Sequence, residues 1–166
     1  MPFVIEWVEK CGDDQQTQLI KTPAGDLSVE SCGDVICRTE WANGDQFEVG
    51  TKKNLIAEKL DGYCQDPGRE IPIKLLHQGS PFCHRVWEQL CRIPFGTVLT
   101  YKALATSINT APRAVGGACR ANCFPFIIPC HRVVSVSGPG GYAGQRHGDA
   151  ITVKLKLLGF ESEFGK

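Results

Sequence analysis

The chain's most reactive combination of side chains is the tripeptide Cys130-His131-Arg132, which lies between two apolar runs. Apolar residues fill positions 126–129 before it and 133–134 after it. Polar groups removed from water cost several kcal/mol unless they are paired, so a buried segment of this kind needs a use for them. A cysteine reacts as its thiolate, and a neighbouring imidazole can act as the base that forms it. The segment therefore predicts a nucleophilic Cys130 with His131 as its base.

The same tripeptide occurs again at Cys83-His84-Arg85. It belongs to a segment in which Phe82, Val86, Trp87 and Leu90 recur at helical spacing. A turn of a surface helix offers nothing that would hold or activate a thiol, so we interpret Cys83 as a structural residue. The tripeptide alone is a weak signal, and the prediction for Cys130 rests on its surroundings.

A pair of glycines, Gly116-Gly117, lies inside another helical segment. Each glycine costs about 1 kcal/mol relative to alanine in a helix interior, so the pair needs a compensating use. Without side chains, the helix face flanked by Arg113 and Arg120 could approach a phosphodiester backbone or a groove wall. Close packing of the helix inside the domain is an equally good alternative.

A glycine-rich loop at residues 137–144 contains one aromatic side chain, Tyr142. It is not a P-loop, because the Lys-Ser/Thr ending is missing. The loop either folds over a substrate, where Tyr142 would stack on a planar base, or is a plain surface connection.

Short strand-like segments make up most of the first half of the chain, at residues 3–5, 18–20, 26–29, 34–38 and 46–49. Turn-forming residues separate most of them. The pattern predicts an antiparallel meander followed by a short helix at residues 53–60.

The second half of the chain has helical spacing, and we place the boundary near Ser80, which gives domains 1–80 and 81–166. Thr100 is expected to cap a helix at residues 101–107, and Thr110 with Pro112 to open another that runs to about residue 122. Two short helices joined by a tight turn suggest a helix-turn-helix.

The end of the chain predicts one more amphipathic helix, in which Ile151, Leu155 and Leu158 recur before Gly159.

The composition indicates a globular protein: 166 residues, 42% of them hydrophobic, with a formal net charge of +0. Residues 1–81 carry an excess of acidic side chains and residues 82–166 an excess of basic ones, which is typical of a nucleic-acid-binding half but also of a merely solvated surface. The nine cysteines are an odd number without regular spacing and predict reduced thiols. Without a signal peptide or a run of roughly 18 apolar residues, we expect an intracellular protein that does not enter a membrane.

An ordered set of residues resembles the O6-alkylguanine-DNA alkyltransferases over roughly residues 82–163. The set consists of Tyr101, residues 113–118, Asn122, residues 128–134, Gly141-Tyr142 and Leu157-Leu158. The N-terminal half is similar only loosely, chiefly at residues 22–27. Cys123 departs from the proline that many relatives have there.

The resemblance implies a role for each matching residue. Cys130 would accept the alkyl group from O6 of guanine, His131 would be its base through a bridging water, and Glu161 would orient the imidazole. Tyr101 would donate a hydrogen bond to the departing guanine, and Asn122 would brace the turn that carries the cysteine. The implied DNA-binding residues are Arg113, Ala114, Gly116, Gly117, Tyr101 and Arg120, with Arg113 filling the gap left by the base. The implied pocket residues are Val133, Pro125, Tyr142 and Ala143.

The resemblance also implies the partner and the fold. The partner would be double-stranded DNA with the alkylated guanine flipped out of the helix, bound through the minor groove by a monomer. Repair would be stoichiometric and irreversible, would need no cofactor, and could extend to O4-alkylthymine. The expected α+β fold is a small antiparallel sheet domain of ribonuclease H-like form, followed by a winged-helix-like domain with a helix-turn-helix. The nucleus is the expected location in a eukaryote and the cytoplasm in a prokaryote.

Two other functions remain open, a damage-binding module and a thiol hydrolase. Non-repairing relatives typically lack the acceptor cysteine, whereas this chain keeps Cys130, His131 and Glu161. A hydrolase would need an oxyanion hole and repeated turnover, and nothing in the sequence indicates either.

Some relatives hold a structural zinc ion in the N-terminal domain. The residues here that could bind one are Cys11, Cys32, Cys37, Cys64 and His77. Their spacing is not a recognisable zinc pattern, so no metal is predicted.

Overall fold

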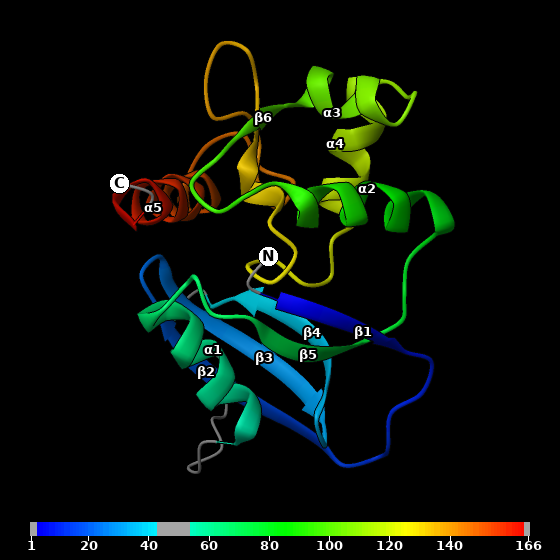
Figure 1. Ribbon diagram of the computed structural model, residues 1–166, viewed down its shortest axis with the longest axis vertical. Helices are drawn as coiled ribbons and strands as arrows, with labels where there is room; N and C mark the ends of the chain where they lie inside the picture. The colour runs from blue at the N-terminus through cyan, green and yellow to red at the C-terminus, as the bar shows by residue number, and fades with distance from the viewer. Residues whose placement is uncertain (1–2, 43–53, 165–166) are drawn as a thin grey trace. The chain divides into compact units, whose positions relative to one another are not determined.

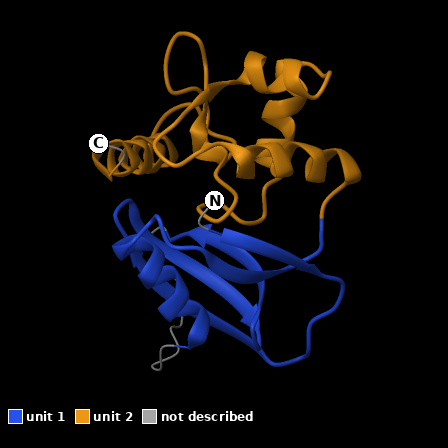
Figure 2. Ribbon diagram, in the orientation of Figure 1, with its two compact units in different colours: residues 1–78 blue, residues 79–166 orange. Residues whose placement is uncertain are grey.

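The computed structural model describes residues 3–42 and 54–164. The chain divides into two compact units, unit 1 at residues 1–78 and unit 2 at residues 79–166 (Figure 2). The strand predicted at residues 46–49 lies outside the described residues.

In the part of unit 1 that the structure describes, a five-stranded sheet packs with one helix (Figure 1). The strand order is β1-β5-β4-β3-β2. The elements are β1 (Phe3–Val8), β2 (Gln15–Thr22), β3 (Gly25–Cys32), β4 (Val35–Trp41), α1 (Leu55–Gln65) and β5 (Ile71–Leu76).

The sheet is mixed, which corrects the predicted antiparallel meander. β2, β3 and β4 do pair antiparallel in succession, but β5 lies between β1 and β4 and is parallel to both. A parallel pair needs a long crossover, and the segment containing α1 supplies it between β4 and β5. The short β5 run contains Pro72, and the sequence pattern did not reveal it.

The core of unit 1 lies between the sheet and α1. Leu27, Ile36, Leu60 and Leu75 are fully buried there. Asn54 caps α1 by accepting a hydrogen bond from the backbone N–H of Ala57 at 3.0 Å. The helix continues past the predicted end at residue 60.

Unit 2 contains most of the helices and a small parallel strand pair (Figure 1). Its elements are α2 (Pro81–Arg92), β6 (Leu99–Thr100), α3 (Tyr101–Ser107), α4 (Pro112–Arg120), the single-turn helix η1 (Cys130–Arg132), β7 (Val133–Val134) and α5 (Asp149–Phe164). Val86, Trp87 and Leu90 of α2 are buried, as their helical spacing predicted. The Trp87 indole N–H donates to the Ala118 carbonyl at 2.9 Å and joins α2 to α4.

The two short helices begin differently. The Thr100 hydroxyl accepts from the Ala103 N–H at 3.0 Å, which confirms the predicted cap of α3. The prediction that Thr110 caps α4 is wrong, because the capping position is Ala111 and no side chain caps that helix. The ring of Pro112 fixes its φ at a value that suits the first helical turn. The Thr110 N–H donates to the Ala105 carbonyl at 2.9 Å, and this hydrogen bond closes the turn between α3 and α4.

The last helix is longer than predicted. α5 continues through Gly159, and its buried residues are Lys154, Leu157 and Glu161. Leu155, which the spacing placed on the apolar face, is 52% exposed. Buried contacts on both sides of Gly159 outweigh its poor helix propensity, and this extension places Glu161 on a helix. Among the described residues, no helix is long and apolar enough to span a bilayer.

Candidate active site

A tightly tied turn carries Cys130 at the start of η1. The Asn122 side-chain N–H₂ donates to the Ile128 carbonyl at 3.1 Å and to Cys130 Sγ at 3.3 Å. The Asn122 side-chain oxygen accepts from the Phe124 N–H at 2.8 Å. Between these contacts Phe126 adopts a φ of 80°, a left-handed conformation that is uncommon for a bulky residue. One amide side chain therefore holds both ends of the strained loop and contacts the thiol.

The Cys130 thiol is buried and protonated at rest. Cys130 as a whole is 5% exposed to solvent. Burial raises its pKa, and this effect outweighs the hydrogen bond from Asn122, the charge of Lys154 and a backbone hydrogen bond, which all lower it. A base is therefore required to generate the thiolate.

His131, Arg132 and Glu161 form a buried network that joins η1 to α5. His131 Nε2 lies 2.6 Å from Glu161 Oε1. Arg132 donates from Nε to Glu161 Oε2 at 2.9 Å and from one terminal nitrogen to Oε1 at 2.9 Å. Its other terminal nitrogen donates to the Ile93 carbonyl at 2.8 Å. Glu161 is thus shared between the imidazole and a guanidinium.

The charges in this network assign the imidazole tautomer. Burial by itself would raise the pKa of Glu161, but His131 and Arg132 outweigh it and hold that pKa at about 2. Burial lowers the pKa of His131 despite the neighbouring carboxylate, so the ring is neutral at neutral pH. A neutral ring that donates from Nε2 to the carboxylate keeps Nδ1 as an acceptor. Within the described part of the chain, His131 Nδ1 is buried without a hydrogen-bond partner.

Lys154 places a buried cation beside the acceptor. Its ammonium group donates to the Val133 carbonyl at 2.6 Å and to the Gly141 carbonyl at 2.9 Å. It also lies 5.8 Å from the centre of the Tyr101 ring. Burial lowers its pKa, and the Cys130 thiolate would raise it. Lys154 therefore ties the strand after the acceptor to the glycine-rich loop.

A hollow of about 620 Å³ lies between α3, α4 and the glycine-rich loop. Its walls include predicted residues from all three segments: Tyr101, Arg113, Gly116, Gly117, Arg120 and Tyr142. The Tyr101 hydroxyl donates to the Gly141 carbonyl at 3.3 Å, and burial raises the pKa of Tyr101 to about 12. The hydroxyl therefore keeps its proton and can donate it in a hydrogen bond.

Other predicted site residues lie behind or beside these walls. Val133 is fully buried, Pro125 forms an isolated bridge with Ile128, and Ala143 is exposed with a φ of 48°. Ala114, on α4, is half-buried. None of these is a wall residue of the hollow, and neither is Cys130.

Comparison with known proteins shows the family. Residues 81–163 match the family described as 6-O-methylguanine DNA methyltransferase, DNA binding domain. The methylated-DNA--protein-cysteine methyltransferase of Metallosphaera sedula is 38% identical over 150 residues, 87% of this chain and 92% of that protein. The Archaeoglobus fulgidus protein of the same name is 40% identical over 109 residues, 65% of this chain and 74% of that protein.

The chain belongs to the O6-methylguanine methyltransferase family. The crystal structure of Mycobacterium tuberculosis OGT in complex with DNA is similar to this methyltransferase with a TM-score of 0.69 at 28% identity, over 89% of this chain and 93% of that chain. The shared α+β architecture and the family match agree with the resemblance inferred from residues 82–163.

Sequence reasoning missed two residues of the methyltransferase site, Lys154 and Arg132. Arg132 was visible in the tripeptide but received no role, although a charged residue inside an apolar run implies a buried partner. Lys154 lies three residues before Leu157 and seven before Glu161, the spacing of one helix face. A prediction that extended the last helix through Gly159 would have placed Lys154 on the same face as Leu157 and Glu161.

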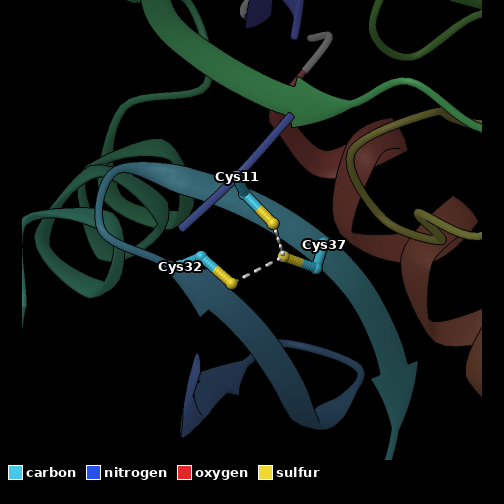
Figure 3. A group of neighbouring side chains, drawn as sticks. All are labelled: Cys11, Cys32 and Cys37. Atoms are coloured by element: carbon cyan, nitrogen blue, oxygen red, sulfur yellow. Dashed lines mark hydrogen bonds between the residues drawn. The ribbon is translucent and has the colours of Figure 1, made fainter. Parts of the chain in front are cut away.

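The described residues that could hold a metal lie outside the acceptor site of this methyltransferase. Three of the five predicted candidates, Cys11, Cys32 and Cys37, form a group in unit 1 (Figure 3). Cys64 and His77 do not belong to it.

Proposed function

We propose that this protein repairs DNA by transferring an alkyl group, typically methyl, from O6 of guanine to Cys130. The observation that carries this proposal is a buried Cys130 followed by a His131–Glu161 pair at 2.6 Å, in a chain of the methyltransferase family. The protein is a methylated-DNA--protein-cysteine methyltransferase.

The reaction begins with proton transfer away from the thiol. His131 Nδ1 takes the proton of Cys130 through a bridging water, and Glu161 stabilises the imidazolium that forms. The thiolate attacks the alkyl carbon, a carbon–sulfur bond forms, and the bond between that carbon and O6 breaks. The electron pair of the broken bond stays on the guanine, where the Tyr101 hydroxyl stabilises the developing charge by a hydrogen bond.

The product ends the reaction cycle of this protein. A thioether is a poor leaving group, so the alkylated Cys130 is not regenerated. Transfer is therefore stoichiometric and irreversible, and no cofactor takes part.

The proposed partner is double-stranded DNA with the alkylated guanine flipped into the hollow. A carbon attached to O6 is out of reach of Cys130 while the guanine is stacked in the duplex. Tyr142 lies in the wall of the hollow, and Val133, Pro125 and Ala143 would complete the pocket around the base.

The proposed DNA-contacting surface is α3 and α4, acting as a helix-turn-helix in the minor groove. A Cβ added at Gly116 or Gly117 would meet nothing within 4 Å, which favours close approach of an external backbone over packing inside the unit. Arg113 and Arg120 are exposed beside them, with Ala114 on the same helix. The DNA complex of the Mycobacterium tuberculosis relative supports this partner.

We also propose the finer architecture and setting. Residues 1–80 form a ribonuclease H-like scaffold, and residues 81–166 form a winged-helix-like domain that carries the acceptor. The mixed sheet, with antiparallel strands continuing into parallel ones, supports the first assignment. The α3–α4 pair beside the β6–β7 strands supports the second. The protein acts as a monomer in the compartment that holds the DNA, nucleus or cytoplasm.

Intact-protein mass spectrometry with excess O6-methylguanine duplex tests the function. We expect one added methyl group, located on Cys130 by peptide mapping. Cys130→Ala abolishes the transfer, whereas Cys83→Ala, which changes the same tripeptide elsewhere, leaves it intact. An unmodified protein that still binds the lesion would establish a damage-recognition module instead. Repeated turnover would establish a hydrolase. A parallel reaction with O4-methylthymine duplex decides whether that base is also a substrate.

A further inference from the structure

The hollow beside α4 has a further wall, which the segment at residues 141–146 provides. Gly141, Tyr142, Gly144, Gln145 and Arg146 line the hollow there. The last two follow the glycine-rich loop and were not among the predicted site residues. No step of the transfer uses the charged member of this wall, Arg146.

A tight turn gives the 141–146 segment a defined shape. The backbone groups of Tyr142 and Gln145 exchange two hydrogen bonds, each of 2.8 Å. Between them, Ala143 has a φ of 48° and Gly144 a φ of 78°, the pattern of a type I′ turn. Alanine is uncommon in this left-handed conformation, and residues held in such conformations cluster in active sites and ligand clamps. The turn therefore fixes the point from which the Arg146 side chain extends.

Contacts with three helices hold the 141–146 segment at the hollow. The Gly141 carbonyl accepts hydrogen bonds from the Tyr101 hydroxyl of α3 at 3.3 Å and from the Lys154 ammonium group of α5 at 2.9 Å. A Cβ built on Gly144 would lie 3.6 Å from Arg120 Cγ, so the stem of this α4 side chain lies beside the turn. The segment is therefore a structured part of the wall.

The hollow carries positive charge without a counter-charge in its wall. Arg113, Arg120 and Arg146 line it, and its wall residues include no aspartate or glutamate. All three arginines are exposed, and no ion pair joins any of them to another residue in the described part of the chain. Arginines that only keep a surface solvated are usually interspersed with acidic residues. Like charges gathered around a concave surface instead raise the positive potential there and attract anions.

We propose that Arg146 binds a phosphate that flanks the flipped nucleotide, while α4 contacts the DNA from another wall of the hollow. This inference rests on the proposed function, in which the alkylated guanine enters the hollow. The sugar and both flanking phosphates stay at the rim, because the extruded nucleotide remains joined to its strand. The exposed guanidinium of Arg146 can donate two parallel N–H groups to phosphate oxygens there.

The Arg146 contact favours the extruded nucleotide over the stacked one. While the guanine is stacked, its flanking phosphates follow the backbone of the duplex and lie away from the hollow. A contact that forms only after extrusion stabilises only the extruded state, so it shifts the equilibrium towards that state. Arg146 is thus a DNA-binding residue whose effect on alkyl transfer comes through extrusion.

Binding of lesion DNA tests the proposal, with each substitution added to Cys130→Ala so that the lesion persists. The probe is a duplex with one O6-methylguanine, and fluorescence anisotropy gives its affinity at several salt concentrations. Arg146→Gln should reduce the slope of log affinity against log salt by about 0.9, because one phosphate contact is lost. Arg146→Lys, which keeps the charge, should retain the slope. Arg69→Gln, at an exposed arginine of unit 1, is the matched control and should also retain it.

A neutral linkage in the DNA identifies the phosphate. Two further duplexes carry a methylphosphonate immediately 5′ or immediately 3′ of the lesion. One of them should bind the Cys130→Ala protein about 10-fold more weakly, since a hydrogen bond to a charged group is lost. The same linkage should not weaken binding further when Arg146→Gln is present. An unchanged salt slope in Arg146→Gln, or losses that add at both linkages, would overturn the proposal.

Transfer by proteins that keep Cys130 separates this inference from the proposed function. Arg146→Gln should have the circular dichroism and thermal midpoint of the wild type, because the side chain is exposed. It should still add one methyl group to Cys130, but with a single-turnover rate on the duplex about 10-fold lower. A rate equal to that of the wild type would overturn the effect on extrusion. A wild type that binds the lesion duplex and transfers no methyl group would overturn the proposed function, while the binding experiments would still decide the role of Arg146.

Discussion

At the scale of single residues, the site balances buried charges against one another. Cys130, His131, Lys154 and Glu161 are all nearly inaccessible to solvent. Glu161 is ionised because His131 and Arg132 compensate its burial, and Lys154 supplies a positive charge that lowers the pKa of the Cys130 thiol. The resting site thus contains a neutral thiol and a neutral imidazole between fixed charges, an arrangement prepared to stabilise charge separation when the proton moves.

Lys154→Met should slow alkyl transfer. The substitution removes the positive charge that lowers the pKa of Cys130, so that pKa should rise, and the thiolate population and the rate at neutral pH should fall about 10-fold if it rises by about 1. Single-turnover kinetics and the pH dependence of iodoacetamide labelling at Cys130 measure both effects. Lys156→Met, on the exposed face of α5, is the control. An unchanged pH profile in Lys154→Met would show that the lysine only supports the loop.

Glu161→Gln should destabilise the protein by about 3–5 kcal/mol at neutral pH, because it leaves Arg132 buried without its counter-charge. A lowered carboxyl pKa contributes stability that is present above the unfolded value of about 4.3 and is lost as pH falls towards about 2. The lowered His131 pKa also makes stability fall as pH drops below about 6.5, because the unfolded imidazole binds the proton more readily. Urea unfolding at several pH values should show the carboxyl-dependent loss in the wild type and not in the variant. If the free energy of unfolding of the two proteins changed with pH in parallel, the assignment of this pH dependence to Glu161 would be wrong.

At the scale of elements, α5 and the α3–α4 pair position the chemistry. α5 presents Lys154, Leu157 and Glu161 on one buried face, so two charged residues of the site share one rigid support. The α3–α4 pair presents part of the wall of the hollow, including Gly116 and Gly117, at which an added Cβ would meet nothing within 4 Å. Asn122 connects the end of this pair to the acceptor through its contact with Cys130 Sγ.

Gly117→Ala should separate folding from DNA binding. An added Cβ meets nothing within 4 Å in the free protein, so helix propensity should raise stability by up to about 1 kcal/mol. The same methyl group should weaken binding to DNA if α4 approaches the backbone closely. Gly159→Ala in α5, also free of contacts within 4 Å, should gain stability without a loss of affinity. Chemical denaturation and fluorescence anisotropy measure the two effects, and equal affinities for both variants would exclude a close approach at Gly117.

At the scale of the whole molecule, the acidic and basic halves of the sequence correspond to a sheet-containing unit and a unit that carries the acceptor. A basic surface that neutralises phosphates releases counterions, so binding weakens as salt increases. The exposed Arg113 and Arg120 beside the hollow are expected to contribute to this effect.

Arg120→Gln should reduce the slope of log affinity against log salt by about 0.9, since it removes one phosphate contact, whereas Arg113→Gln, which removes the side chain that fills the gap left by the base, should lower the affinity with a smaller change in slope. Arg92→Gln is the matched control, because Arg92 already pairs with Glu88 at 2.6 Å on α2. Titration of duplex DNA at several salt concentrations gives the slopes. A slope unchanged in both test variants would place the DNA surface elsewhere.

The sequence predicted local features better than long-range ones. The helix at residues 101–107 and its cap at Thr100 were predicted correctly, because capping and helix propensity depend on interactions within a few residues. The placement of β5 between β1 and β4 depends on pairing between distant segments, which periodicity does not report. The helix face of Lys154 follows from its spacing to Leu157 and Glu161, but its partners, the Val133 and Gly141 carbonyl groups, are brought close only by the fold.

The 5% exposure of Cys130 has a consequence for the useful lifetime of the protein. A thiol that reacts once must avoid oxidants and stray electrophiles while it waits for a lesion. Burial and the raised pKa keep the Cys130 thiol in the unreactive protonated form. Only an alkylated guanine that is flipped into the site brings its electrophilic carbon within reach of the sulfur. The selectivity of the thiol for alkylated guanine and its resistance to oxidation therefore have the same physical origin, because reagents that cannot enter the buried site react with it slowly.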